Sequence, residues 1–165
     1  MSDRLYSPWR LEYILSVKDE ECIFCIEPSK ENDEKHLILF RNKLSFIIMN
    51  TYPYNNGHLL IVPNKHVANL NDLSKQESTD LIETVQICEK IIKNVYTPDG
   101  LNIGVNLGKA AGAGIDDHLH VHVVPRWNGD VNFMSTLGET RVIPESFQQA
   151  YAKLKEEFDN EKVKK

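Results

Sequence analysis

The sequence predicts an α+β fold with an antiparallel sheet of about five strands, one long helix and a second helix near the C-terminus. Two observations predict this class. Short runs rich in aliphatic and β-branched residues come as neighbouring pairs, which is typical of strands joined by hairpins. The stretches with apolar residues at helical spacing interrupt these pairs and do not alternate with single strands, which disfavours a doubly wound parallel sheet.

The first elements follow from local signals. Ser7 followed by Pro8 predicts a short helix over residues 9–17, and the polar residues 19–35 predict a loop. A turn over residues 51–57 is predicted by one proline, two asparagines and a glycine, and Asn42-Lys43 predicts a hairpin. Five runs have the composition of strands: residues 36–41, 44–50, 58–63, 101–107 and 118–126.

Two further helices are predicted by capping and periodicity. Ser74 and Glu77 match a capping box, which predicts a helix over residues 75–95. Its apolar stripe consists of Leu81, Val85, Cys88, Ile92 and Val95. Pro144 predicts the start of the last helix. The stripe of that helix consists of Phe147, Ala150, Tyr151, Leu154 and Phe158.

Composition and charge exclude several classes of function. The chain has 165 residues and a formal net charge of −5, with no basic block outside Lys162–Lys165. This argues against a protein that binds nucleic-acid backbones, which needs a concentrated basic face. No apolar run approaches the roughly 20 residues that span a bilayer, and residues 1–15 lack the apolar centre of a signal peptide. We therefore expect a cytoplasmic protein that binds neither nucleic acid nor membranes.

The strongest motif is His118-x-His120-x-His122. Successive side chains of a strand point to opposite faces, so these three rings are expected on one face. Half of the six histidines of the chain lie within these five residues, which makes an incidental polar face a poor explanation. One imidazole could serve as nucleophile or base, with its neighbours fixing its tautomer. A metal site on alternate strand positions is the rival interpretation.

A glycine-rich loop precedes this row. Gly108–Gly114 would let backbone N–H groups approach an anion closely, although such a loop alone is weak evidence. It lacks the Gly-Lys-Ser/Thr ending of a Walker loop. Beside a row of histidines, it suggests a phosphate held next to a nucleophile.

These motifs resemble the histidine triad (HIT) family of nucleotide-binding proteins. The likeness covers residues from about 36 to 127 and includes Gly57-His58 and the stretch Asn106–Gly112. The flanking motifs Ser7–Arg10, Arg126–Met134 and Arg141–Pro144 are similar to the bacterial branch of diadenosine tetraphosphate phosphorylases and triad hydrolases. The resemblance implies one HIT-like domain over residues 1–165. Its core would span about 36–127, with a helix and Cys-x-x-Cys loop in 1–35 and an extension over 128–165.

The resemblance also implies roles for single residues. His120 would attack the α-phosphorus and form a covalent nucleotidyl-histidine, which phosphate or water then releases. His122 would contact the scissile phosphate and the leaving oxygen, while His118 and His58 would support and orient the row. The implied substrate-binding groups are Asn50 at the ribose, Asn106, and the backbone of Gly112, Ala113, Gly114 and Ile115 at the phosphate.

The Cys22-x-x-Cys25 pair could supply two of four tetrahedral zinc ligands. In a cytosolic chain, such a pair indicates metal binding or redox chemistry before a disulfide framework. Some bacterial triad proteins resemble this pattern, and the likeness implies a structural Cys₂His₂ zinc site from Cys22, Cys25, His66 and His118. The alternative is two reduced cysteines in a loop, whereas Cys88 on the helical stripe is expected to be an ordinary buried thiol.

The sequence thus predicts a nucleotidyl-transfer enzyme that cleaves dinucleoside polyphosphates, with water or phosphate as acceptor. Three alternatives are a nucleoside phosphoramidate hydrolase, a nucleotide sensor without catalysis, and a metal-dependent hydrolase with the three histidines as zinc ligands. Family likeness implies a homodimer that forms through the long helix and a sheet edge.

Overall fold

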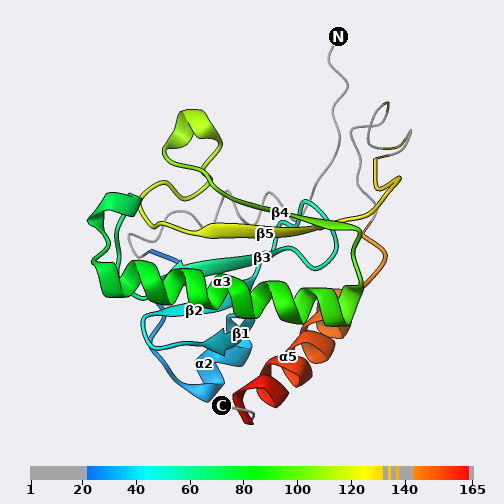
Figure 1. Ribbon diagram of the computed structural model, residues 1–165, viewed down its shortest axis with the longest axis horizontal. Coiled ribbons are helices and arrows are strands. Elements are labelled where there is room, and N and C mark those ends of the chain that lie inside the picture. Colours follow the sequence, from blue (N-terminus) through cyan, green and yellow to red (C-terminus); the bar gives the residue numbers. More distant parts are fainter. Residues whose placement is uncertain (1–21, 132–133, 135–136, 138–142, 164–165) are drawn as a thin grey trace.

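The computed structural model describes residues 22–131, 134, 137 and 143–163. In this part of the chain, five strands form one antiparallel sheet in the order β1-β2-β3-β5-β4 (Figure 1). The strands are β1 (Ile38–Arg41), β2 (Ser45–Met49), β3 (Leu59–Pro63), β4 (Gly100–Val105) and β5 (Val121–Arg126). Helix α3 (Lys75–Tyr96) lies along one face, and α5 (Phe147–Val163) packs against α3 and β1. This architecture confirms the predicted α+β fold.

Several predicted boundaries are wrong. The segment expected to be a loop contains the short helix α2 (Lys30–Lys35), which begins after the side chain of Ser29 accepts a hydrogen bond from the backbone of Asn32. The last helix begins at Phe147 and not at Pro144, because Ser146 and Gln149 cap each other's backbone N–H groups. The strands are one to three residues shorter or shifted relative to the predicted runs. The predicted helix over residues 9–17 lies outside the described residues.

Apolar side chains cover both faces of the central strands. One cluster lies between the sheet and the helices, and the other lies on the opposite face beneath the Cys-x-x-Cys loop. The strand alternation divides β3 between them, because Leu59 and Ile61 join the helix-side cluster and Leu60 and Val62 join the other. The pairing of these strands therefore places each residue attached to them on one defined face of the sheet.

Helix α3 begins and ends as its sequence requires. Both hydrogen bonds of the Ser74–Glu77 capping box are present, and the helix ends at Thr97, whose φ is 44°. The predicted stripe is confirmed: Leu81, Val85, Cys88 and Ile92 are buried, and Val95 packs against them.

Buried polar groups join α3 to β2. The hydroxyl of Ser45 donates to the carboxylate of Asp80 over 2.5 Å and lies 2.8 Å from the hydroxyl of Thr84. The side-chain amide of Asn42 donates to the same threonine. The three buried members of this group, Ser45, Asp80 and Thr84, all have partners, so burial leaves none of them unsatisfied.

No helix in the described residues is long and apolar enough to cross a membrane.

Candidate functional site

The three histidines of the row share one face of the sheet. Leu119, Val121 and Val123 alternate with them and belong to the helix-side cluster. The rings of His120 and His122 have centroids 4.9 Å apart on the opposite side. Only His122 lies within the hydrogen-bonded strand, since β5 begins at Val121, yet the alternation extends back through His118.

His58 joins the row from the neighbouring strand. It directly precedes β3 and is 2% exposed, and its Nε2 atom lies 2.9 Å from Nδ1 of His122. The backbone N–H of Tyr54 donates to Nδ1 of His58 over 3.0 Å, so this nitrogen is an acceptor. A neutral His58 therefore carries its proton on Nε2 and donates it to His122.

This order of donors and acceptors also sets the tautomer of His122. Because its Nδ1 accepts from His58, a neutral ring has its proton on Nε2. That Nε2 atom is buried and has no hydrogen-bond partner within the described residues. The arrangement therefore leaves one unpaired N–H donor within the histidine row, and a phosphate oxygen that reaches it would satisfy it.

His120 has the complementary arrangement. Its Nδ1 atom donates to the backbone carbonyl of His118 over 2.9 Å. In a neutral ring this leaves the lone pair on Nε2, the form in which an imidazole attacks an electrophile. The row thus holds a nucleophilic nitrogen on one ring next to a hydrogen-bond donor on another.

Burial keeps the two donor rings uncharged. Desolvation, followed by the neighbouring His122 and His120, lowers the pKa of His58 to about 3. Desolvation and His120 likewise lower the pKa of His122 to about 4. Both rings are therefore neutral at pH 7, and each has the one donor and one acceptor that the hydrogen-bond order requires.

The turn between β2 and β3 brings His58 to this position. Gly57 in that turn has a φ of 71°, and a Cβ atom there would lie 2.7 Å from the Cε2 atom of Tyr96. Both the backbone angle and the close approach require glycine. Tyr54 lies in the same turn, and its ring stacks on His122 with centroids 5.6 Å apart and an interplanar angle of 13°.

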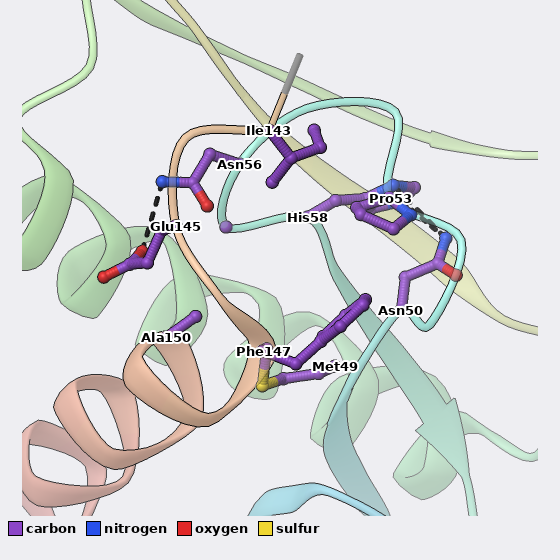
Figure 2. Close-up of a pocket in the computed structure, with 10 residues that line it drawn as sticks. Met49, Asn50, Pro53, Asn56, His58, Ile143, Glu145, Phe147 and Ala150 are labelled. Atoms are coloured by element: carbon purple, nitrogen blue, oxygen red, sulfur yellow. Dashed lines mark hydrogen bonds between the residues drawn. The ribbon is translucent and has the colours of Figure 1, made fainter. Parts of the chain in front are cut away.

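The expected substrate-binding residues lie around the row, although some of their polar groups are already paired. The amide of Asn50 lies 3.2 Å from Nδ1 of His58, and its oxygen accepts from the backbone of Tyr52 (Figure 2). The side chain of Asn106 approaches Gly112, being 3.9 Å from the position that a Cβ would take there.

The glycine-rich loop contains the single-turn 3₁₀ helix η2 (Lys109–Ala111). Hydrogen bonds in and after this turn occupy some of the backbone N–H groups that could otherwise bind an anion. The N–H groups of Gly112 and Ala113 donate to carbonyl groups within the loop. The backbone N–H groups of Gly114 and Ile115 have no acceptor among the described residues, so they are the available anion donors. An open cleft of about 280 Å³ also begins at His122 and extends over β4 and β5, with Tyr54, Asn106 and Arg126 in its lining.

The four predicted metal ligands come together. The ligand atoms of Cys22, Cys25, His66 and His118 all lie within 4.8 Å of one another, so this cluster could hold a metal ion. Sulfur-to-nitrogen distances are 3.3 Å for Cys22–His118, 3.4 Å for Cys25–His66 and 3.8 Å for Cys25–His118. Zinc bonds of ordinary length at tetrahedral angles place such atoms about 3.6 Å apart, so the residues fit that ion.

Neighbouring groups orient these ligands. Nε2 of His118 lies 2.9 Å from the carbonyl of Pro63, which directs the lone pair of Nδ1 toward the thiols. Phe24, between the two cysteines, is buried and its ring lies 5.6 Å from that of His118 and 5.3 Å from that of His120. The Cys-x-x-Cys loop therefore packs directly on the histidine row.

Among the described residues, the possible metal cluster includes His118 but neither His120 nor His122. This argues against the alternative in which all three histidines of the row hold one zinc ion.

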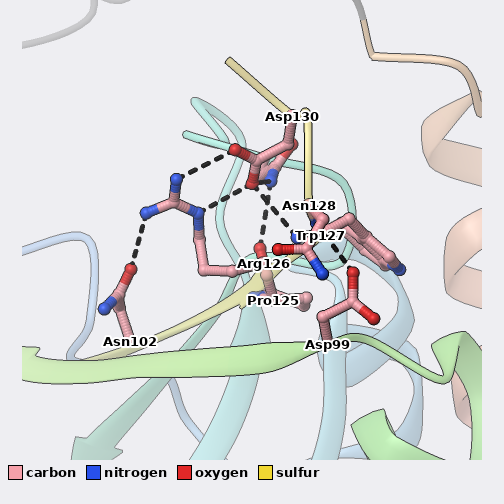
Figure 3. A network of polar contacts seen from close by, with 8 residues as sticks. Asp99, Asn102, Pro125, Arg126, Trp127, Asn128 and Asp130 are labelled. Carbon is pink, nitrogen blue, oxygen red and sulfur yellow. Dashed lines mark hydrogen bonds and ion pairs between the residues drawn. The ribbon is translucent and has the colours of Figure 1, made fainter.

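Sequence reasoning missed several residues around the site. Tyr54 and Phe24 contact the histidine rings, while Asp130 and Glu145 bind the turn before β3 from the segment that follows β5 (Figures 2 and 3). The partners of the two acids are 75 and 89 residues away along the chain. No local pattern indicates such contacts.

Cys88 on α3 is fully buried, as the sequence predicts, and desolvation raises its pKa.

The chain is similar to known proteins in sequence and in fold. The AP-4-A phosphorylase of Mycobacterium tuberculosis is similar at 43% identity over 150 residues, covering 86% of this chain and 77% of that protein. The structure of a hypothetical histidine triad nucleotide-binding protein from Sulfolobus tokodaii has a TM-score of 0.67 at 27% identity, covering 87% of this chain and 95% of that one. A Zn-bound histidine triad family protein from Mycobacterium smegmatis shares the fold, with a TM-score of 0.66 at 24% identity and coverage of 87% and 97%.

The family model described as HIT domain matches residues 30–129, more than half of the chain. That range includes the whole sheet, the turn that carries His58, and the row His118–His122. The chain therefore belongs to the HIT family.

Proposed function

We propose that this chain is a nucleotidyl-transfer enzyme that cleaves dinucleoside polyphosphates such as diadenosine tetraphosphate, with phosphate or water as the acceptor. The likeness to the mycobacterial AP-4-A phosphorylase supports the substrate class. The observation that carries the chemistry is the order of hydrogen bonds in the row, which leaves a lone pair on Nε2 of His120 and an N–H donor on Nε2 of His122.

In the first step, the lone pair on Nε2 of His120 attacks the α-phosphorus. An N–P bond forms, and the bond from phosphorus to the leaving nucleotide's oxygen breaks with its electron pair going to that oxygen. The ring becomes positively charged, and its Nδ1 proton remains bonded to the carbonyl of His118, which stabilises the charge. The leaving oxygen belongs to a nucleotide phosphate, so a hydrogen bond from His122 without proton transfer is enough to stabilise it.

In the second step, an oxygen of phosphate or water attacks the same phosphorus, and the N–P bond electrons return to Nε2 of His120; an attacking water gives up one proton to solvent. The N–H groups of Gly114 and Ile115, together with Asn106, would hold the phosphate oxygens. Asn50 would bind the ribose after exchanging its present bonds to the turn for the hydroxyl groups.

We further propose that Cys22, Cys25, His66 and His118 hold a structural zinc ion. The fit of their spacing to a tetrahedral site and the bond from His118 to Pro63 support this. Bound zinc would supply a closed four-ligand crosslink between the Cys-x-x-Cys loop and the sheet. Because His118 also accepts the hydrogen bond from His120, the crosslink would hold the row in place.

A homodimer is proposed as the working form. Strand β4 is an edge strand of the sheet with Ile103 46% exposed, and α3 carries Ile82 at 57% exposure. An unpaired strand edge and exposed apolar side chains are each features that favour association with a second copy of the chain. Light scattering after size-exclusion chromatography would measure the mass, and a monomer at micromolar concentration would contradict the proposal.

A product assay tests the reaction. Diadenosine tetraphosphate is incubated with the protein, with and without inorganic phosphate, and the nucleotides are separated by chromatography. ADP and ATP formed only with phosphate indicate a phosphorylase, while AMP and ATP formed without it indicate a hydrolase. Nucleotide binding without products in either case would refute the proposed enzyme and favour a nucleotide sensor.

A further inference from the structure

Asp130 holds the turn between β2 and β3 from one side. Its carboxylate accepts from the side-chain amide of Asn55 over 2.8 Å and from two nitrogens of Arg126 over 2.7 and 2.9 Å (Figure 3). The amide of Asn55 also donates to the carbonyl of Pro125. The Arg126 guanidinium holds the pKa of Asp130 well below its usual range, at about 2, so the carboxylate stays charged.

Glu145 holds the same turn from the other side. Its carboxylate accepts from the amide of Asn56 over 3.2 Å (Figure 2). It also accepts from the hydroxyl of Tyr96 over 2.9 Å and from the ammonium of Lys153 over 2.8 Å. The same ammonium lies 4.1 Å from the ring centroid of Tyr96. Glu145 thus ties the turn to the C-terminal end of α3 and to the first turns of α5.

The two tethered asparagines are adjacent in sequence and lie between Tyr54 and His58. The N–H of Tyr54 donates to Nδ1 of His58, and the N–H of His58 donates to the carbonyl of Asn55 over 3.2 Å. Two donors therefore define the tautomer of His58, the N–H of Tyr54 at 3.0 Å and the amide nitrogen of Asn50 at 3.2 Å, and the first of them belongs to the segment that Asn55 and Asn56 tether.

We propose that Asp130 and Glu145 are positioning residues that clamp this turn and thereby fix the tautomers of His58 and His122. Without the Tyr54 donor, only the longer contact from the amide of Asn50 still favours an accepting Nδ1. A neutral His58 can then hold its proton on Nδ1 in part of the molecules, so that its Nε2 becomes an acceptor. His122 then keeps its proton on Nδ1, and its Nε2 loses the hydrogen that a phosphate oxygen needs. The clamp therefore selects the reactive form, and its effect on turnover rests on the proposed function.

The test loosens the turn at its own side chains, because each carboxylate has several partners and removing either one could unfold the segment. Asn55→Ala, Asn56→Ala and the double variant each remove amide donors to the acids. Nitrogen NMR of histidine-labelled protein at pH 7.5 reports which ring nitrogen carries the proton, with His58→Gln and His122→Gln assigning the signals. We expect protonated Nε2 on both rings in the unchanged chain and mixed tautomers in the double variant.

Kinetics give a second readout. Since substrate contacts are untouched, we expect kcat of the double variant to fall about ten- to a hundredfold, with KM changed by no more than about twofold. Lys153→Met is the matched control: it removes a partner of Glu145 and the contact with Tyr96 but keeps the bond to Asn56. It should leave both the nitrogen signals and kcat unchanged.

The outcomes separate the clamp from the proposed reaction. Unchanged tautomers in a folded double variant overturn the clamp, even if the unchanged chain cleaves its substrate. An equal loss of kcat in Lys153→Met also overturns it, because general loosening would then explain the effect. Mixed tautomers confined to the asparagine variants support the clamp, even if the unchanged chain shows no turnover and the proposed reaction fails.

Discussion

Gly57→Ala tests how closely the turn before His58 is packed. The backbone there has a φ of 71°, and the added methyl group would lie 2.7 Å from Cε2 and 3.0 Å from Cδ2 of the Tyr96 ring. That ring cannot easily withdraw, since its hydroxyl donates to Glu145 and Lys153 lies over its face. The substitution therefore combines backbone strain with a steric clash.

The magnitude has two parts. A non-glycine residue in the left-handed region costs about 1–2 kcal/mol. Overpacking against a held ring costs about 1–3 kcal/mol, which makes the expected loss in unfolding free energy about 2–5 kcal/mol. Because the turn carries His58, kcat should fall as well, while the cluster of Cys22, Cys25, His66 and His118, which shares no residue with the turn, should keep its capacity to bind zinc.

Urea unfolding followed by circular dichroism measures the loss. Two companion variants separate the contributions of the ring and of its hydroxyl. Tyr96→Leu removes the ring and should relieve the clash in the Gly57→Ala background, whereas Tyr96→Phe removes only the hydroxyl that holds the ring against Glu145 and should relieve it less. We expect the Gly57→Ala and Tyr96→Leu losses to be less than additive by about 1–3 kcal/mol. A Gly57→Ala protein within about 0.5 kcal/mol of the unchanged chain would refute the reasoning.

Three other predictions concern the histidines and the cysteines. His120→Ala should raise the barrier by about 4–8 kcal/mol and abolish the nucleotidyl adduct seen by mass spectrometry, with binding weakened by only about 1–2 kcal/mol; near-normal turnover would contradict it. Cys22→Ser with Cys25→Ser should remove the bound zinc and lower the unfolding free energy, and elemental analysis that finds no metal in the unchanged chain would exclude the site. The pKa of His58 is about 3 in the folded chain and about 6.5 when unfolded, so acid protonates the unfolded state first. Its contribution to stability is full above pH 6.5 and declines by about 2 kcal/mol by pH 5, a loss that His58→Gln should abolish in urea titrations.

The sequence predicted those features that depend on local periodicity. The alternation from His118 to Val123 placed three rings on one face without knowledge of the strand boundary, because the period of two extends beyond the hydrogen-bonded ladder. Helix α3 was predicted almost to the residue, since its capping box and apolar stripe agree. Helix α2 was missed because its six residues carry no apolar stripe.

The tethers of the site could not be predicted in this way. Asn55 and Asn56 read as ordinary turn formers, and nothing in the sequence pairs them with Asp130 and Glu145. Such contacts depend on how the segment after β5 returns to the sheet, and this is decided by tertiary packing. The metal ligands were identified only because a family likeness joined the cysteine pair to His66 and His118 across the chain.

The strand order has a consequence for how the reactive row comes into existence. Strands β1, β2 and β3 follow one another directly and can pair as soon as they are made, and β4 and β5 form a second local pair. The border between β3 and β5 is the one pairing in the described sheet that closes a long loop, and His58 and His122 face each other across it, 64 residues apart. We expect loop closure to make this contact slow to form. The hydrogen bond between His58 and His122, and with it the donor form of His122, would then arise in the same step that completes the sheet.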